Sequence, residues 1–285
     1  IGKNAFSNCT SLQSLTLPAS LEEIRSYAFY GCSSLETVRL SPGGNLTSVG
    51  NFAFAQTSVT EFLAPSSLRT IGESAFEDCH ALQTVTLEGG VERVDAHAFR
   101  NCTGLKHLVV GESVIHMGID AFAKCYAVQH LELYSSSLTS FHSPNLTTVI
   151  VGYSTGRSGR FPKCASLTDI THLYPYTIIE DSAFLGCASL TEFSIPDGVT
   201  EIGSRAFCET GLTQLTIPAS VKKISWAAFQ DSALQKIIFC GDAPDSFDRS
   251  GFEGITVEVY YPANNATWEK VIQKEFAGTV TWIPY

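Results

Sequence analysis

The sequence predicts a repeat solenoid built mainly of β-strands, with about 12 coils of about 23 residues each. Three observations predict it: one motif returns at a nearly constant spacing, each copy holds a stretch of alternating apolar and polar residues, and the copies cover almost the whole chain. A single copy is too short to bury its own apolar side chains, so stability must come from stacking on neighbouring copies. We expect a right-handed superhelix that ends in a C-terminal cap of one helix and one strand.

The repeated motif is A-F-x-x-C-x-x-L-x-x-Φ-x-Φ, where Φ is apolar, and residues 75–87 show it in full. The apolar residue that opens its strand segment recurs every 18 to 24 residues, most often every 23, which is typical of a leucine-rich-repeat solenoid. These opening residues are Leu12, Leu35, Val59, Leu82, Leu105, Val128, Leu146, Leu167, Leu190, Leu212 and Leu234. The run 255–261 adds a probable twelfth coil.

The alternation within each strand segment predicts a buried face and an exposed face. In 12–17, Leu15 and Leu17 share one side while Ser14 and Thr16 share the other, since successive strand side chains point to opposite faces. We expect the apolar set to form the core, together with the Phe of each Ala-Phe pair.

Most of the nine cysteines lie three residues after a repeat Phe. Free Cys packs as a small apolar residue, so this fixed position predicts a ladder of buried thiols, with disulfides or a metal site as the weaker alternatives. The cysteines at this position are Cys9, Cys32, Cys79, Cys102, Cys125, Cys164 and Cys187.

The repeats run over 1–254 and are interrupted once, over about 134–160, where no Ala-Phe pair occurs. Within that segment, 152–160 is rich in Ser and Gly and predicts a projecting loop, which is either drift in a degenerate repeat or a ligand-contacting excursion. Residues 255–285 hold the last coil and the cap, with helical spacing of apolar residues over 265–276 and a strand around Val280 and Trp282. The chain opens within a repeat, without Met or signal peptide, so we expect a fragment or processed form.

Composition disfavours several classes of function. Eighteen basic against 28 acidic residues give a net charge of −10, which repels nucleic acid and anionic lipid surfaces. No apolar run is long enough to insert into a membrane. The nucleophile, phosphate-binding and zinc-protease motifs G-x-S-x-G, G-x-x-x-x-G-K and H-E-x-x-H do not occur, so we expect neither an enzyme nor a cofactor.

The outward strand positions, two and four residues after each opening residue, define a candidate binding surface. Threonine dominates these positions, as suits an exposed strand, and apolar exceptions among charged and His residues make part of the surface amphipathic. His107 and His130 should lie about 5 Å apart on adjacent coils; with Glu132 they could hold zinc, but we favour solvated histidines and assign no metal. The candidate ligand-binding residues are Arg39, Glu61, Leu63, His107, Val109, His130, Glu132 and Ile150, with Tyr153, Arg157 and Arg160 from the loop.

Runs such as Ile71-Gly72-Glu73-Ser74-Ala75-Phe76-Glu77-Asp78-Cys79-His80-Ala81-Leu82 resemble the BspA-like leucine-rich repeats of bacterial and some protozoan surface proteins. The ending Tyr260-Tyr261-Pro262-Ala263 is similar to that family's C-terminal end. The resemblance implies a secreted or cell-surface, adhesin-like protein that binds a protein or glycoprotein of a host or neighbouring cell. The alternative is a structural spacer that holds another domain away from the cell surface. Five N-glycosylation sequons, Asn265-Ala266-Thr267 among them, would matter only in a eukaryotic source.

Overall fold

The computed structural model describes residues 1–41, 43–138, 140–153 and 157–285, and it confirms a parallel β-solenoid of about 12 coils with almost no helix. The chain divides into two compact units, residues 1–138 (unit 1) and 139–285 (unit 2). The division falls inside the irregular segment 134–160. No helix in the described part of the chain is long and apolar enough to cross a membrane.

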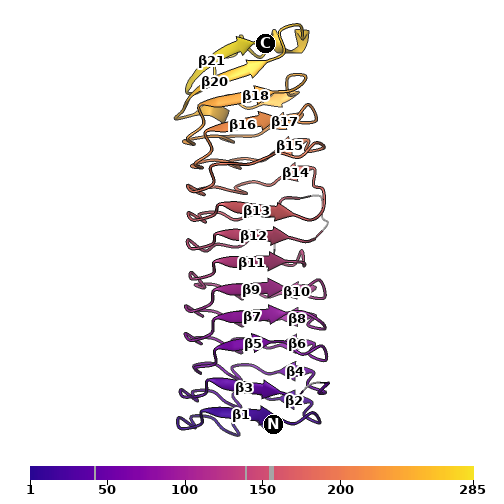
Figure 1. Ribbon diagram of the computed structural model, residues 1–285, viewed down its shortest axis with the longest axis vertical. Helices are drawn as coiled ribbons and strands as arrows, with labels where there is room; N and C mark the ends of the chain where they lie inside the picture. The colour runs from indigo at the N-terminus through magenta and orange to yellow at the C-terminus, as the bar shows by residue number, and fades with distance from the viewer. Residues whose placement is uncertain (42, 139, 154–156) are drawn as a thin grey trace. The chain divides into compact units, whose positions relative to one another are not determined.

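Unit 1 has two walls of parallel strands, which Figure 1 shows stacked rung upon rung. One wall is built from the strand segments with alternating residues, and the other from two-residue strands that follow them. The first wall contains β1 (Ser14–Leu17), β3 (Thr37–Leu40), β5 (Glu61–Leu63), β7 (Thr84–Leu87), β9 (His107–Val110) and β11 (His130–Leu133). The second contains β2 (Glu23–Ile24), β4 (Ser48–Val49), β6 (Thr70–Ile71), β8 (Arg93–Val94) and β10 (His116–Met117).

The two walls of unit 1 differ in continuity. The short strands form one unbroken sheet from β2 to β10, whereas β1 pairs with β3 in a separate sheet, and β5, β7, β9 and β11 pair in succession. Among the described residues no ladder joins β3 to β5. The alternation was therefore sufficient to predict each strand, but not this break.

Unit 2 repeats the two-walled plan. Its longer strands are β12 (Thr148–Val151), β13 (Asp169–His172), β16 (Gln214–Ile217), β18 (Lys236–Phe239), β20 (Thr256–Tyr261) and β21 (Thr279–Pro284). Its short strands are β14 (Ile178–Ile179), β15 (Glu201–Ile202), β17 (Lys223–Ile224) and β19 (Ser246–Phe247), and 3₁₀ helices cover η1 (Arg249–Phe252) and η2 (Ala266–Trp268). Residues 190–196, all described, form no strand although their pattern predicts one.

The core of each coil contains the Phe of its Ala-Phe pair. In unit 1 the rings of Phe76, Phe99 and Phe122 stack with centroids 5.1 and 5.0 Å apart, and their planes are within 4° of parallel. This spacing matches the strand spacing, so each ring contacts the next coil as a ladder hydrogen bond does. The row begins at Phe6, whose side chain is 43% exposed.

Six of the seven repeat cysteines are buried, as predicted, and each contacts the preceding coil. The thiol of Cys102 donates to the carbonyl oxygen of Phe76 at 3.2 Å, and Cys187 does the same to Phe161. The thiol thus joins two coils as well as filling space. Cys9 departs from the prediction because it is exposed, since no described coil precedes it.

Three coils replace this cysteine with a hydroxyl residue, and they bond differently. Thr57, Thr210 and Ser232 are buried, and each hydroxyl donates to the Phe carbonyl three residues earlier in its own coil. In these coils the next opening apolar residue follows the Phe by five positions instead of six, as Val59 follows Phe54. The hydroxyl therefore closes a turn that is one residue shorter.

Burial of the thiols makes stability depend on alkaline pH. Desolvation raises the pKa of the Cys79 thiol from 9.0 to about 11. A group with a raised folded-state pKa contributes stability that is complete below its unfolded pKa and is lost as pH rises through its folded pKa, here between about pH 9 and 11. We expect Cys79 to account for a loss of about 2 kcal/mol in the free energy of unfolding between about pH 8.5 and 10.5.

This loss can be isolated by urea denaturation in reducing buffer at the two pH values. A Cys79→Ala variant should lose about 2 kcal/mol less than the unsubstituted chain over the same interval, because its buried position no longer titrates. Cys9→Ala, at an exposed thiol, is the matched control and should follow the unsubstituted chain. Equal losses in all three proteins would show that burial does not hold the thiol protonated.

The C-terminal cap corrects one prediction. The strand is present, since β21 pairs in parallel with β20 from Thr279 to Pro284. The helix expected over 265–276 is a three-residue 3₁₀ helix, η2, followed by turns. The apolar spacing there results from Trp268 and Phe276 packing against the last coils, and it does not require an α-helix.

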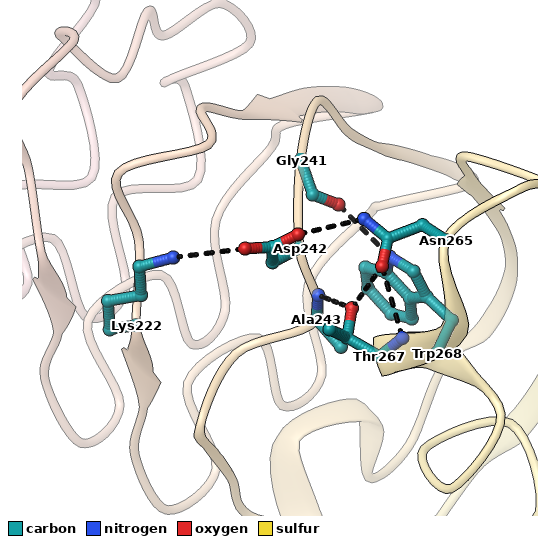
Figure 2. Close-up of polar contacts among 7 residues, drawn as sticks. All are labelled: Lys222, Gly241, Asp242, Ala243, Asn265, Thr267 and Trp268. Carbon is teal, nitrogen blue, oxygen red and sulfur yellow. Dashed lines mark hydrogen bonds and ion pairs between the residues drawn. The ribbon is translucent and has the colours of Figure 1, made fainter.

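Polar contacts fix this cap to the preceding coil (Figure 2). The Asn265 amide donates to the Asp242 carboxylate at 2.9 Å, while its oxygen accepts from the Thr267 backbone N–H at 3.0 Å and caps η2. The Thr267 hydroxyl accepts from the Ala243 N–H, and the Trp268 indole N–H donates to the Gly241 carbonyl. Both sides of the Asn265 amide are therefore occupied, so this sequon is part of the cap's structure.

Candidate functional site

Outward side chains of β5, β7, β9 and β11 form one surface of unit 1, called here the strand face. Parallel pairing sets the residues in two rows, because strands in register place equivalent positions side by side. The first row is Glu61, Thr84, His107 and His130; the second is Leu63, Thr86, Val109 and Glu132. The residues between them, such as Leu108 and Leu131, are buried, so the rows point away from the core.

The second row carries the apolar part of the strand face. Leu63 is 54% exposed, and Val109, which lies in register with Thr86 and Glu132, is partly exposed. A strand in an ordinary exposed sheet presents polar residues at such positions. These two side chains are therefore candidates for contact with a partner.

The first row ends in a stacked pair of imidazoles. The rings of His107 and His130 have centroids 5.0 Å apart with an interplanar angle of 12°, which confirms the spacing expected from the repeat. Among the described residues no group of three or more His, Cys, Asp or Glu side chains could hold a metal ion. The pair contributes flat polar surface next to Val109 and Glu132.

Tyr134 belongs to this surface and was missed by the sequence analysis. Its hydroxyl donates to the Glu132 carboxylate at 2.7 Å, and this hydrogen bond raises the pKa of Tyr134. The contact fixes the direction of the carboxylate at the end of the second row. Its signal was the spacing of two residues, which places both side chains on one face of an extended segment.

The other candidate residues are not part of this surface. Ile150 lies on β12 in unit 2, where it pairs with Thr171 and is half-buried. Arg39 lies on β3, across the break in the sheet, and with Glu61 and Leu63 it borders a cavity of about 340 Å³. The strand face thus brings together six of the eleven predicted residues, namely Glu61, Leu63, His107, Val109, His130 and Glu132.

The loop predicted over 152–160 does not project where the structure describes it. Arg157 forms a parallel bridge with Ile178, and Arg160 forms one with Ser140, so both residues belong to the solenoid wall. The Arg157 guanidinium pairs with the Glu180 carboxylate at 3.2 Å. Tyr153 is half-buried, and its burial raises the pKa of the phenol to about 12. Residues 154–156 of the predicted loop lie outside the described residues.

The fold and strand face define a leucine-rich repeat protein of the parallel β-solenoid type. The sequence matches the BspA type leucine rich repeat region over residues 1–129 and 154–269, and the chain belongs to that family. The segment between the two matches lies almost wholly within the irregular stretch that the repeat analysis identified.

Solved structures of bacterial proteins share the fold. A leucine-rich repeat protein from Bacteroides ovatus is 23% identical with a TM-score of 0.61, over 99% of this chain and 81% of that chain. The pneumococcal vaccine antigen PcpA is 19% identical with a TM-score of 0.53, over 96% of this chain and 79% of its own. A leucine rich cell surface protein from Faecalibacterium prausnitzii is 24% identical with a TM-score of 0.37, over 85% and 83% of the two chains. No curated protein sequence matches this chain.

Proposed function

We propose that the chain is a non-catalytic recognition module of a cell-surface or secreted protein, and that it binds a protein or glycoprotein through the strand face. The observation that supports this proposal is the exposure of Leu63 and Val109 in a row that also holds Glu132. Apolar side chains surrounded by polar ones form the usual centre of a protein interface, because desolvated anchors supply most of the affinity. Family membership and the likeness in fold to a vaccine antigen agree with an exposed location.

The proposal predicts that charge at the centre of the strand face abolishes binding. In a Leu63→Glu, Val109→Glu variant, affinity for the partner should fall at least tenfold, since a single interface anchor contributes about 2 kcal/mol or more. The measurement is surface plasmon resonance against a panel of immobilised extracellular-matrix proteins and glycans. Circular dichroism and thermal unfolding should show that both substituted strands remain folded.

The matched control is Ile238→Glu, which places the same charge at the equivalent outward position of β18 in unit 2. It should bind as the unsubstituted chain does. Equal loss in both variants would show a non-specific charge effect and would remove the strand face as the site. Absence of saturable binding across the panel would favour the structural spacer instead.

A further inference from the structure

Unit 1 contains a cavity of about 340 Å³ at the break between β3 and β5. Its walls are apolar and come from inward residues of adjacent coils, among them Leu17, Val38, Leu40 and Phe62. Val38 and Leu40 keep partial exposure, whereas the equivalent Val85 and Leu87 of β7 are completely buried. The cavity is therefore open to solvent at the point where the sheet is interrupted.

Sequence differences in these coils account for the cavity. The Phe62 ring packs on Phe76 at 4.5 Å and reaches Phe99 at 6.3 Å, which directs it away from β3. The next inward position after Leu17 and Leu40 in the repeat is Ala64, whose short side chain leaves that row unfilled. Leu46 also follows Leu40 by six positions, where Val91 follows Leu87 by four, so the connection is longer. The space is thus a property of the sequence at three separate places.

Two charged side chains border the cavity, and neither has a partner within the described part of the chain. Arg39 on β3 and Glu61 on β5 make no hydrogen bond or ion pair there, and both are exposed. By repeat position Arg39 aligns with Leu63, while Glu61 lies two residues earlier, roughly 7 Å away along the strand. A guanidinium beside an apolar cavity suits a carboxylate, which it can bind with two parallel hydrogen bonds.

We propose that this cavity binds a medium-chain aliphatic carboxylate, with its chain among the apolar residues and its head on Arg39. A cavity of about 150 Å³ is known to hold one benzene ring, so 340 Å³ accommodates a chain of roughly ten carbon atoms. The ligand is a free small molecule, so this site is independent of the partner proposed for the strand face. Glu61 opposes the head group weakly because of its offset.

Isothermal titration calorimetry of the full chain with sodium decanoate and sodium octanoate tests the site. Decanoate should bind saturably at one site per chain, and octanoate about fifteen-fold more weakly, since each buried methylene changes affinity about fourfold. Arg39→Gln should weaken decanoate binding at least fivefold, and Glu61→Gln should strengthen it. Arg93→Gln, at an exposed arginine on the opposite wall, is the matched control and should leave binding unchanged.

A second variant tests the cavity itself. Val38→Phe fills the space from its wall and should abolish binding, with thermal unfolding showing that the chain is folded; Ala64→Leu, which restores the residue type found at Leu17 and Leu40, serves if Val38→Phe does not fold. Binding that survives both filling variants, equal affinity for octanoate and decanoate, or tighter binding of octylammonium than of octanoate would each overturn the proposal. Absence of any heat or thermal shift with decanoate would do the same.

Discussion

Phe99→Ala is expected to lower the free energy of unfolding by about 3–5 kcal/mol, a large part of the stability of an ordinary domain. The Phe99 ring is completely buried and lies between Phe76 and Phe122, with centroids 5.1 and 5.0 Å away. Alanine would leave a cavity in two ring interfaces at once, and coils that touch only their neighbours cannot close it from elsewhere. Urea denaturation followed by circular dichroism measures the loss.

Phe6→Ala is the matched control for this substitution. Phe6 occupies the same repeat position and stacks on Phe29 at 5.3 Å, but its side chain is 43% exposed and contacts one ring of the row. Its replacement should cost about 1 kcal/mol or less. If both variants lose the same amount, the stack contributes through local turn geometry, and the proposed continuous aromatic row does not account for the stability.

Trp268→Ala is expected to release the C-terminal cap, again at a cost of about 3–5 kcal/mol. Trp268 is 1% exposed and packs edge to face on Phe239 at 4.8 Å, with Tyr261 and Trp282 within 6 Å. Its indole N–H also holds the Gly241 carbonyl, which the substitution would leave unbonded. Hydrogen exchange should show β21 losing protection, followed by β20.

Trp226→Ala provides the comparison for Trp268→Ala in the same unit. Trp226 is 49% exposed, and its main contact is a cation–π contact with Arg205. The cost should be about 1 kcal/mol, with β21 protection unchanged. Protection of β21 that persists in Trp268→Ala would mean that backbone pairing with β20 holds the last strand without the indole.

The period and alternation of the sequence were sufficient to predict the coils, because inward and outward roles repeat at fixed positions. The stacking of His107 on His130 followed directly from their equivalent places. The interruption between β3 and β5 was not predicted, although Ala64 and the longer connection before Leu46 are visible in the sequence. A repeat alignment records which positions are apolar, but the volume that each side chain fills emerges only when adjacent coils are packed.

The cap and the irregular segment failed for a different reason. Helical spacing over 265–276 reflected several contacts of one aromatic cluster, so periodicity described packing and not backbone conformation. Around Arg157 and Arg160 the motif disappears while the backbone still forms bridges, because parallel pairing uses main-chain groups that every residue has. Loss of the motif therefore did not imply loss of the wall.

The exchange of thiol for hydroxyl also bears on how such a chain can lengthen during evolution. At Thr57, Thr210 and Ser232 the residue type and the turn length change together, so neither a point substitution nor a single deletion alone converts one kind of coil into the other. Duplication of an entire coil copies both features in one event and keeps them compatible. Genes for arrays of this kind should then grow by whole-coil duplication, with each copy inheriting its own turn length.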